Sequence, residues 1–304
     1  MAVLYIDRRG TSLRLDGGAL QLRTAQGESR SLPFGLLDRV VIQAETSLTS
    51  PVLLTLGERG IPVTLIDSRR PERSVALCGG GHGDARRRIA QYSRSRDEAW
   101  RREFAARTVA AKLREQRRLL VEAAAERGEL AGDLHAAARA IAELEDKVRR
   151  GPPADRASLL GWEGAASASY FRAFSRLFAP ALEFHGRNRR PPRDPVNVCL
   201  SLAYTLLHGQ AVSAIAGAGL DPFIGFYHEI DYGRASLASD LVEVFRPQAD
   251  RWVWRTFRAR LLRREHFRFG QDRETLVLGA GPSVFPPPRH RWPAGGLGRV
   301  QSIP

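Results

Sequence analysis

Four acidic or imidazole side chains in the second half of the chain have the chemistry to hold a divalent cation. Glu163 lies in the apolar and small-residue segment LLGWEGAASASYF, and His228 lies in GFYHEIDYG beside aromatic residues. Asp240 and Glu243 are three residues apart in SLASDLVEVFRP, so on a helix they share one face. Carboxylates with one imidazole suit Mg²⁺ or Mn²⁺, and enzymes acting on phosphodiesters commonly use such sites.

Each of these residues also has a purely structural explanation. A buried glutamate such as Glu163 is usually paired with a basic side chain. A lone histidine such as His228 is more often a satisfied hydrogen-bonding residue than a ligand. Asp240 and Glu243 repel one another on a buried helix unless a cation or basic partners lie beside them. Because spacing alone does not bring Glu163 to the other three, the ion-pair and metal-site interpretations both stay open.

Basic and aromatic side chains lie close in sequence to this group. The proline-constrained segment HGRNRRPPRDP, residues 185–195, contains four arginines, among them Arg187 and Arg190. Guanidinium groups suit bidentate phosphate contact, although a solvated charged loop is the alternative. Arg246 follows the acidic helix, and Tyr170 could stack on an unpaired base. These residues are the candidates for DNA binding.

The charge of the chain supports a polyanionic partner. The 304 residues contain 47 Lys and Arg against 33 Asp and Glu, a formal net charge of +14, and only two of the basic residues are lysines. Residues 1–84 carry 10 basic and 9 acidic side chains, which is +1, so residues 85–304 carry 37 against 24, which is +13. The basic charge is therefore concentrated in the same part of the chain as the carboxylates.

Composition excludes several classes of protein. A hydrophobic fraction of 43% argues against disorder as the dominant state. Two distant cysteines exclude a disulfide scaffold and a zinc ribbon. We find no apolar run near the ~20 residues that span a bilayer and no secretion pattern at the start. We therefore expect a cytoplasmic protein that does not bind membranes.

The hydrophobic periodicity divides the chain and predicts an α+β fold. Residues 1–78 form a small β-rich domain, with a hairpin at 13–22, strands at 40–42 and 61–66, and one helix at 50–59. Residues 79–84, GGGHGD, are expected to form a hinge, and residues 281–304 a mobile Pro- and Gly-rich tail. Between them, residues 85–280 form a larger all-α domain with a short strand near 275–278. Its predicted helices cover 86–125 (as one or two), 134–148, 159–178, 198–216, 237–245 and, after an interruption at Pro247, a last helix to about 262.

Three segments resemble a known family in their order and spacing. They are WEGAASASYF, HGRNRRPPRDPVNVCLSLAYTLL and GFYHEIDYGRASLASDLVEVFRP, and they are similar to the CRISPR-associated spacer-acquisition integrases, the first of the numbered Cas proteins. The segments YIDRRGTSLRLDGG and LDRVVIQAETSLTSPVLLTLGERGIPVTLID are similar to the β-domain of that family. The resemblance covers roughly Val3 to Leu278.

The resemblance implies a fold and a set of site residues. The amino-terminal domain would be β-sandwich-like and used in dimerisation, and the helical domain would be catalytic. The family's metal ligands match Glu163, His228 and Glu243, and Asp240 matches an acidic position that supports them. Its basic loop and the following helix match Arg187, Arg190 and Asn197.

The resemblance also implies the reaction and the partners. A homodimer would pair with the small ferredoxin-like second Cas protein and bind a DNA duplex with 3′ overhangs, with Mg²⁺ or Mn²⁺ as cofactor. A DNA 3′-hydroxyl would attack a phosphodiester at the leader–repeat junction of the CRISPR array, so no Ser or Cys nucleophile is needed. Two alternatives stay open: a standalone nuclease on branched or single-stranded DNA that uses the same site, and a non-catalytic basic DNA-binding scaffold.

Overall fold

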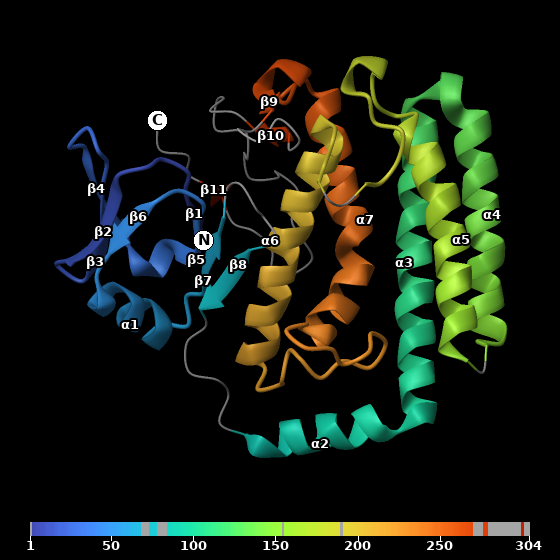
Figure 1. The fold of residues 1–304 in the computed structure, drawn as a ribbon, viewed down its shortest axis with the longest axis horizontal. Coiled ribbons are helices and arrows are strands. Elements are labelled where there is room, and N and C mark those ends of the chain that lie inside the picture. The colour runs from blue at the N-terminus through green and yellow to red at the C-terminus, as the bar shows by residue number, and fades with distance from the viewer. Residues whose placement is uncertain are drawn as a thin grey trace. The chain divides into compact units, whose positions relative to one another are not determined.

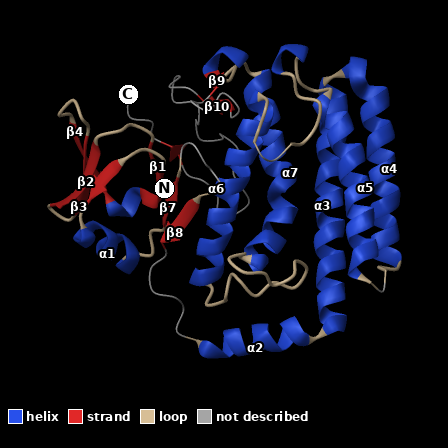
Figure 2. Ribbon diagram, viewed as in Figure 1, coloured by secondary structure: helices blue, strands red, loops and turns tan. Residues whose placement is uncertain are grey.

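The computed structural model describes residues 2–67, 73–77, 84–153, 155–188, 191–269, 276–278 and 299–300. A β-rich amino-terminal part is followed by a predominantly helical part, which confirms the predicted α+β class (Figures 1 and 2). The chain forms two compact units, and the helical unit comprises Arg86–Ala211 and Asp221–Ala280. The predicted hinge, apart from Asp84, and nearly all of the predicted tail lie outside the described residues.

The β-rich unit contains two sheets. The first has the order β11-β1-β5-β7-β8, in which only β7 and β8 pair antiparallel. The second has the order β4-β3-β2-β6, with β2 and β6 parallel and the other pairs antiparallel. The strands are β1 (Ala2–Ile6), β2 (Thr11–Asp16), β3 (Ala19–Arg23), β4 (Ser29–Pro33), β5 (Leu37–Ile42), β6 (Thr46–Leu48), β7 (Val63–Ile66), β8 (Ser74–Leu77) and β11 (Arg299–Val300).

Both sheets and helix α1 (Ser50–Glu58) contribute to one hydrophobic core. Leu4 and Val40 come from the first sheet, Leu13 and Leu20 from the second, and Val52 from α1, and all are nearly fully buried. The alternation of apolar residues along β2 and β3 therefore turns one face of the predicted hairpin inward. This arrangement agrees with the β-sandwich-like domain that was expected.

Helix α1 forms where the sequence predicts it. Pro51 lies in its first turn, and Gly60 follows its end with a φ of 66°, in the left-handed region that favours glycine. The residue that caps the helix is Thr49, whose side chain makes no capping hydrogen bond.

The helical unit is built around one long helix, α3 (Glu98–Glu126), which packs against α4, α5 and α7. Leu113, Leu119 and Leu120 of α3 have no exposed surface. The remaining elements of the second part of the chain are α2 (Ala85–Arg96), α4 (Ala131–Arg150), α5 (Arg156–Ser175), α6 (Pro195–Gly217) and α7 (Ser236–Arg258), with short 3-10 turns and the antiparallel strands β9 (Phe267–Phe269) and β10 (Leu276–Leu278). Helix α6 belongs to the helical unit up to Ala211.

The periodicity left open whether residues 86–125 form one helix or two, and the structure decides between them. Two helices form, because Asp97 interrupts the pattern and caps α3, accepting a hydrogen bond from the backbone nitrogen of Trp100 at 3.0 Å. An aspartate in this position satisfies one of the amide groups that the first turn leaves without a helical partner.

The prediction of two helices separated at Pro247 was wrong. One helix, α7, runs through Pro247, and Ala235 is its capping residue. A proline inside a helix removes one backbone hydrogen bond. Burial offsets that loss, since Val242, Val253 and Trp254 on both sides of it lie in the core.

The arginines that follow in α7 are occupied within the protein. Arg251 Nε lies 2.8 Å from Glu122 Oε2, and Arg255 pairs with the other oxygen of the same carboxylate. Arg258 pairs with Glu126. These ion pairs join α7 to α3, so the three arginines serve helix packing.

Helix α6 is an exception to the expectation that no apolar run approaches the length of a membrane span. It is long and apolar enough to cross a membrane, judged by length and composition only. Three polar residues of its first half are engaged inside the helical unit: Asn197 and Ser201 bind Arg187, and Tyr204 donates to Asp250. These are the contacts of a helix that belongs to a protein core.

Truncation of a core side chain of α3 tests this packing. Leu120→Ala removes a fully buried side chain, and we expect the free energy of unfolding to fall by about 2–5 kcal/mol. Val121→Ala, at the next position and 43% exposed, is the matched control and should change it by less than about 0.5 kcal/mol. Equal losses in chemical denaturation would contradict the orientation of α3.

Candidate active site

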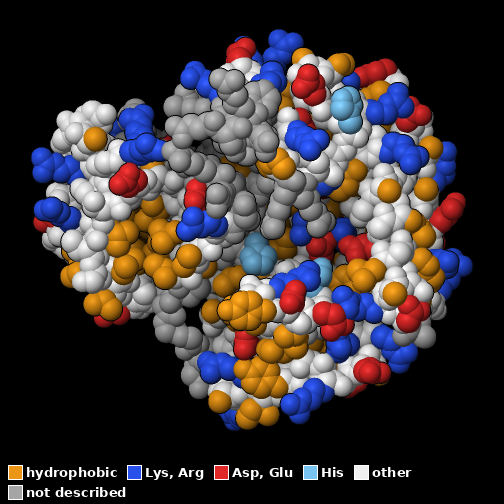
Figure 3. All heavy atoms as spheres, in the orientation of Figure 1, with side chains coloured by type: hydrophobic (Ala, Val, Ile, Leu, Met, Phe, Trp, Pro, Cys, Tyr) orange, Lys and Arg blue, Asp and Glu red, His pale blue; other side chains and the backbone are white. Residues whose placement is uncertain are grey.

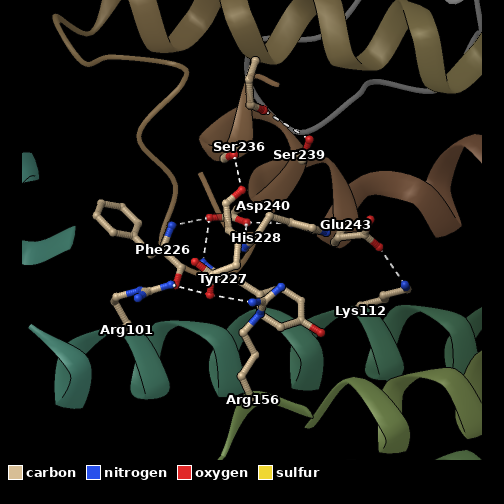
Figure 4. Close-up of polar contacts among 12 residues, drawn as sticks. Arg101, Lys112, Arg156, Phe226, Tyr227, His228, Ser236, Ser239, Asp240 and Glu243 are labelled. Carbon is tan, nitrogen blue, oxygen red and sulfur yellow. Dashed lines mark hydrogen bonds and ion pairs between the residues drawn. The ribbon is translucent and has the colours of Figure 1, made fainter. Parts of the chain in front are cut away.

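Two glutamates from different helices meet at one cationic side chain. Lys112 on α3 directs its ammonium group to Glu163 on α5 and to Glu243 on α7, with 2.6 Å between Nζ and the Glu243 Oε2 atom. Figure 4 shows Glu243 reaching from α7 toward Lys112. Since α3 packs against both α5 and α7, the helix contacts bring together residues that are 80 positions apart in the sequence.

The pair of glutamates is largely buried and electrically balanced. The side chains of Lys112, Glu163 and Glu243 are 10%, 12% and 9% exposed. Arg246, one turn along α7, places Nε 2.9 Å from the second oxygen of Glu243. Burial alone would raise the pKa of Glu243, but the charges of Lys112 and Arg246 outweigh it and lower that pKa to about 2. The carboxylate is therefore ionised at neutral pH.

Asp240 serves the loop that precedes α7. It has no exposed surface and accepts hydrogen bonds from the backbone nitrogens of Phe226, Tyr227 and His228 at 2.7, 3.0 and 2.8 Å. Figure 4 shows the carboxylate facing this backbone. With both oxygens engaged, Asp240 holds the loop in place and is not one of the groups that converge on Lys112. It is thus a supporting residue of the site.

The same carboxylate orients His228. Nδ1 of the ring lies 2.7 Å from Asp240 Oδ1, and the side chain is 17% exposed. A histidine whose Nδ1 is bonded to a carboxylate presents Nε2, the arrangement that metal-ligating histidines usually have. His228 also lies close enough to Glu243 to lower the pKa of that carboxyl.

Close packing of the loop on α7 requires a glycine at position 225. A Cβ atom there would lie 2.7 Å from the backbone carbon of Ser236 and 2.9 Å from Asp240 Oδ2. Tyr227, on the same loop, is 1% exposed and donates its hydroxyl to Glu163. The loop thus contacts both α5 and α7 and carries His228 between them.

A second polar network surrounds the predicted basic loop. Asn197 is fully buried and accepts from Arg187 Nη1 at 2.7 Å, while its amide donates to Asp194 at 2.6 Å and to the Gly186 carbonyl at 2.9 Å. Arg187 also reaches the Ser201 hydroxyl at 3.0 Å. Asn197 therefore fixes the loop and its arginine from inside the protein.

Tyr204 on α6 connects this network to the glutamates. The guanidinium groups of Arg246 and Arg187 lie 4.6 and 5.4 Å from the centre of its ring. Such contacts are attractive because the face of an aromatic ring is electronegative. The Tyr204 hydroxyl donates to the buried Asp250, which also accepts from Tyr170 at 2.9 Å. Two arginines are thus held over one ring beside Glu243.

Several predicted site residues need correction. Tyr170 has no exposed surface and binds Asp250, so it is not available to stack on a DNA base. Asn197 is equally buried and holds Arg187, so it does not contact DNA directly. Arg190 lies outside the described residues. Glu163, His228, Glu243, Arg187 and Arg246 remain candidates for direct contact with metal or substrate.

The donors fit a divalent cation in their chemistry. Glu163 and Glu243 already converge on one positive charge, and His228 has its Nδ1 anchored. Within the described ranges, no three His, Cys, Asp or Glu side chains are grouped closely enough to hold a metal ion. Glu163 and Glu243 are accordingly the pair that converges, and His228 is the third candidate on the adjacent loop.

Three residues of the site were not predicted from the sequence: Lys112, Tyr204 and Asp250. Lys112 lies on α3, in a segment whose dense arginines hid the significance of a buried lysine. A signal was present, because it is one of only two lysines in a chain with 47 basic residues. Tyr204 lies in a segment that resembles the family, but among apolar helical residues that gave no sign of its role, and Asp250 has no local motif around it.

The unit that holds the site has the features of an enzyme acting on nucleic acid. It combines paired carboxylates and an oriented imidazole with neighbouring arginines. It also lies in the part of the chain that carries nearly all of the net positive charge. Figure 3 shows Lys and Arg side chains spread over the visible face of this unit among Asp and Glu side chains. The fold and the site together define an α+β protein of this class.

Comparison with known proteins identifies the family. The family model described as CRISPR associated protein Cas1 matches residues 4–279. A CRISPR-associated endonuclease Cas1 of Thermodesulfovibrio yellowstonii is 37% identical over 295 residues, 96% of this chain and 91% of the relative. The chain belongs to the Cas1 family of CRISPR-associated proteins, which confirms the resemblance seen in the sequence.

Solved structures share the fold over most of the chain. A casposase bound to its integration product has a TM-score of 0.77 at 20% identity, covering 92% of this chain and 79% of that one. A chain of a Cas6-RT-Cas1–Cas2 complex has a TM-score of 0.74 at 26% identity, covering 92% of this chain and 30% of the other.

Substitution of Gly225 tests the packing of the histidine loop. Gly225→Ala would force a methyl group against Ser236 and the Asp240 carboxylate, and we expect a loss of about 1–3 kcal/mol in the free energy of unfolding. The matched control is Gly132→Ala on α4, where a Cβ meets nothing within 4 Å. That variant should be neutral or more stable. Equal stability of both variants in thermal denaturation would contradict the close packing.

The buried Asp250 makes the free energy of unfolding depend on pH, and the sign of that dependence follows from its pKa. Burial raises its pKa from 3.8 to about 6, although Tyr204 and Tyr170 favour the ionised form. The folded state therefore holds this proton more tightly than the unfolded state, and the resulting stability is lost as the pH rises through that interval.

Asp250→Asn removes this titration while keeping a donor and an acceptor for the two tyrosines. The unfolding free energy of the unaltered protein minus that of the variant should fall as the pH rises from about 4 to about 7 and then level off. Taking the difference cancels the other carboxyls. A difference that grows over this range in urea denaturation would contradict the assignment.

Proposed function

We propose that this protein is a divalent-metal-dependent integrase that inserts short DNA duplexes into a CRISPR array by transesterification. The observation that carries the proposal is the convergence of Glu163 and Glu243, from separate helices, on a single positive charge in a largely buried site. Two carboxylates brought together in this way repel each other unless a cation lies between them. A binding scaffold has no use for so costly an arrangement.

Glu163, His228 and Glu243 are the proposed metal ligands, with Mg²⁺ or Mn²⁺ as the cofactor. When bound, such an ion polarises a phosphodiester and lowers the pKa of an attacking hydroxyl. Asp240 keeps the His228 ring turned so that Nε2 is presented. The attacking 3′-hydroxyl belongs to DNA, so the protein supplies position and charge.

Arg187 and Arg246 are the proposed contacts to the phosphate at which strand transfer occurs. Their guanidinium groups share the Tyr204 ring, and Arg246 also binds the candidate ligand Glu243. Guanidinium groups at this place would offset the charge that develops on phosphoryl oxygens. The fixed positions of both arginines limit the freedom lost on binding DNA.

The proposed partners are DNA with 3′ overhangs, a second copy of this chain and the small ferredoxin-like second Cas protein. The relative within a Cas6-RT-Cas1–Cas2 complex supports the last of these. The β-rich unit exposes large apolar side chains, including Leu36, Leu54 and Val75, as a surface used for protein contacts does. DNA as substrate also agrees with the cytoplasmic location expected from the sequence.

Substitution of the candidate ligands tests the proposal. Glu163→Gln, Glu243→Gln and His228→Ala should each lower strand transfer by at least about 100-fold, since loss of a ligand's outer partners alone costs about 10- to 100-fold. The assay measures joining of a labelled duplex with a free 3′-hydroxyl to a repeat-containing target, with Mn²⁺ and with chelator. Glu143→Gln, which changes an exposed glutamate of α4, is the matched control and should keep full activity.

The products separate the alternatives. Joined product that requires metal supports the integrase, whereas cut product alone supports a nuclease at the same site. Full joining by the Glu163→Gln variant, or joining that chelator does not affect, would overturn the site assignment. Circular dichroism of each variant verifies that the fold is retained.

A further inference from the structure

We propose that Lys112 is the resident counterion of the metal site: its ammonium group holds Glu163 and Glu243 together in the absence of metal and leaves them when the divalent cation binds. This inference rests on the proposed metal site at these two glutamates. It assigns to a residue of α3 a role that is separate from ligation and from contact with DNA.

The position of the ammonium group is the first argument. Lys112 Nζ contacts Glu163 Oε1 and lies 2.6 Å from Glu243 Oε2, so it occupies the place between the carboxylates where a shared cation would bind. The two glutamates come from helices α5 and α7, and the lysine from a third helix. One ammonium group therefore offsets the repulsion between two like charges that come from different helices.

Charge balance is the second argument. Glu163 and Glu243 supply two negative charges, and Lys112 and Arg246 supply two positive charges, so the cluster is neutral as it stands. Adding a divalent cation while both basic groups remain would leave an excess of two positive charges among side chains that are mostly buried. Such an excess is costly, and release of one cation halves it.

Lys112 is the cation that can leave. Arg246 is bound to Glu243 and lies over the Tyr204 ring, with its planar group held on two sides. Within the part of the chain that the structure describes, the partners of the Lys112 ammonium group are the two glutamates themselves. A lysine carries a point charge on a flexible four-carbon stem, so it can withdraw its ammonium group from the two glutamates while its backbone stays in α3.

Competition of this kind has a measurable consequence for affinity. Lys112→Met keeps the apolar stem and removes the charge. Without metal, the variant should be less stable than the unaltered protein because two buried carboxylates lose their counterion. With metal, it should bind Mn²⁺ more tightly by about tenfold, since nothing has to be displaced, which corresponds to about 1.4 kcal/mol.

The chain offers a matched control in its only other lysine. Lys147 on α4 is exposed and lies over the Trp162 ring, 4.0 Å from its centre. Lys147→Met changes the net charge by the same amount, at a side chain whose ammonium group lies over a ring and not between the two carboxylates. It should leave Mn²⁺ affinity unchanged, so any effect specific to Lys112→Met does not come from overall charge.

The same pair of lysines allows a test on the unaltered protein that does not depend on folding of a variant. An amine-reactive reagent is applied with and without Mn²⁺, and the two lysine-containing peptides are quantified by mass spectrometry. Lys147 should be labelled equally in both conditions. Lys112 should be protected without metal and become reactive when Mn²⁺ is present.

The outcomes separate this inference from the proposed function. Mn²⁺ binding by calorimetry with no change in Lys112 labelling, or with equal or weaker binding by Lys112→Met, overturns the role of Lys112 and leaves the metal site standing. Absence of Mn²⁺ binding in both proteins overturns the metal site and this inference together. Binding by Lys112→Met alone, or tighter binding with increased labelling of Lys112, supports the inference.

Discussion

The helical unit depends on a single electrostatic constraint: two carboxylates buried near each other must be neutralised. Lys112 and Arg246 meet that constraint for Glu163 and Glu243, and in doing so they connect α3, α5 and α7. Loss of one partner from a buried ionic group costs far more than the group contributes when it is complete. The packing of these three helices and the charge distribution of the site are therefore inseparable.

Hydrogen bonds around the paired glutamates hold two loops of the site in fixed positions. Asp240 holds three successive amides of the loop that carries His228, and Asn197 holds the loop that carries Arg187. Both are buried, and both act on a residue that can face a substrate. A site arranged in this way has its reactive side chains in position before a ligand arrives, which reduces the cost of ordering them on binding.

Much of this architecture could be predicted from the sequence, and the physical reason for each failure is specific. Hairpin and helix periods identify elements whose apolar residues repeat locally, as at residues 13–22 and 50–59. Pro247 misled the prediction because tertiary burial outweighs a lost backbone bond, and burial is not visible in a local pattern. The charges of Glu163 and Glu243 were visible as candidates.

Their partner was not visible, since Lys112 is 51 residues from Glu163 and 131 from Glu243. The prediction that Tyr170 stacks on a DNA base was wrong for a related reason. An aromatic residue beside a charged motif can stack on a ligand or pack in the core, and only the fold decides between them. Contacts between side chains of different helices are therefore the part of the site that is hardest to predict from the sequence.

The bonds of Asp240 also affect how mutational data on such a site should be interpreted. A carboxylate that accepts three backbone amides and orients an imidazole maintains the shape of the loop, so its replacement removes the geometry on which other residues rely. An alanine scan by activity alone would rank it with the proposed metal ligands. Loss of function at this position measures loop order, and only a direct binding measurement distinguishes an organiser from a ligand.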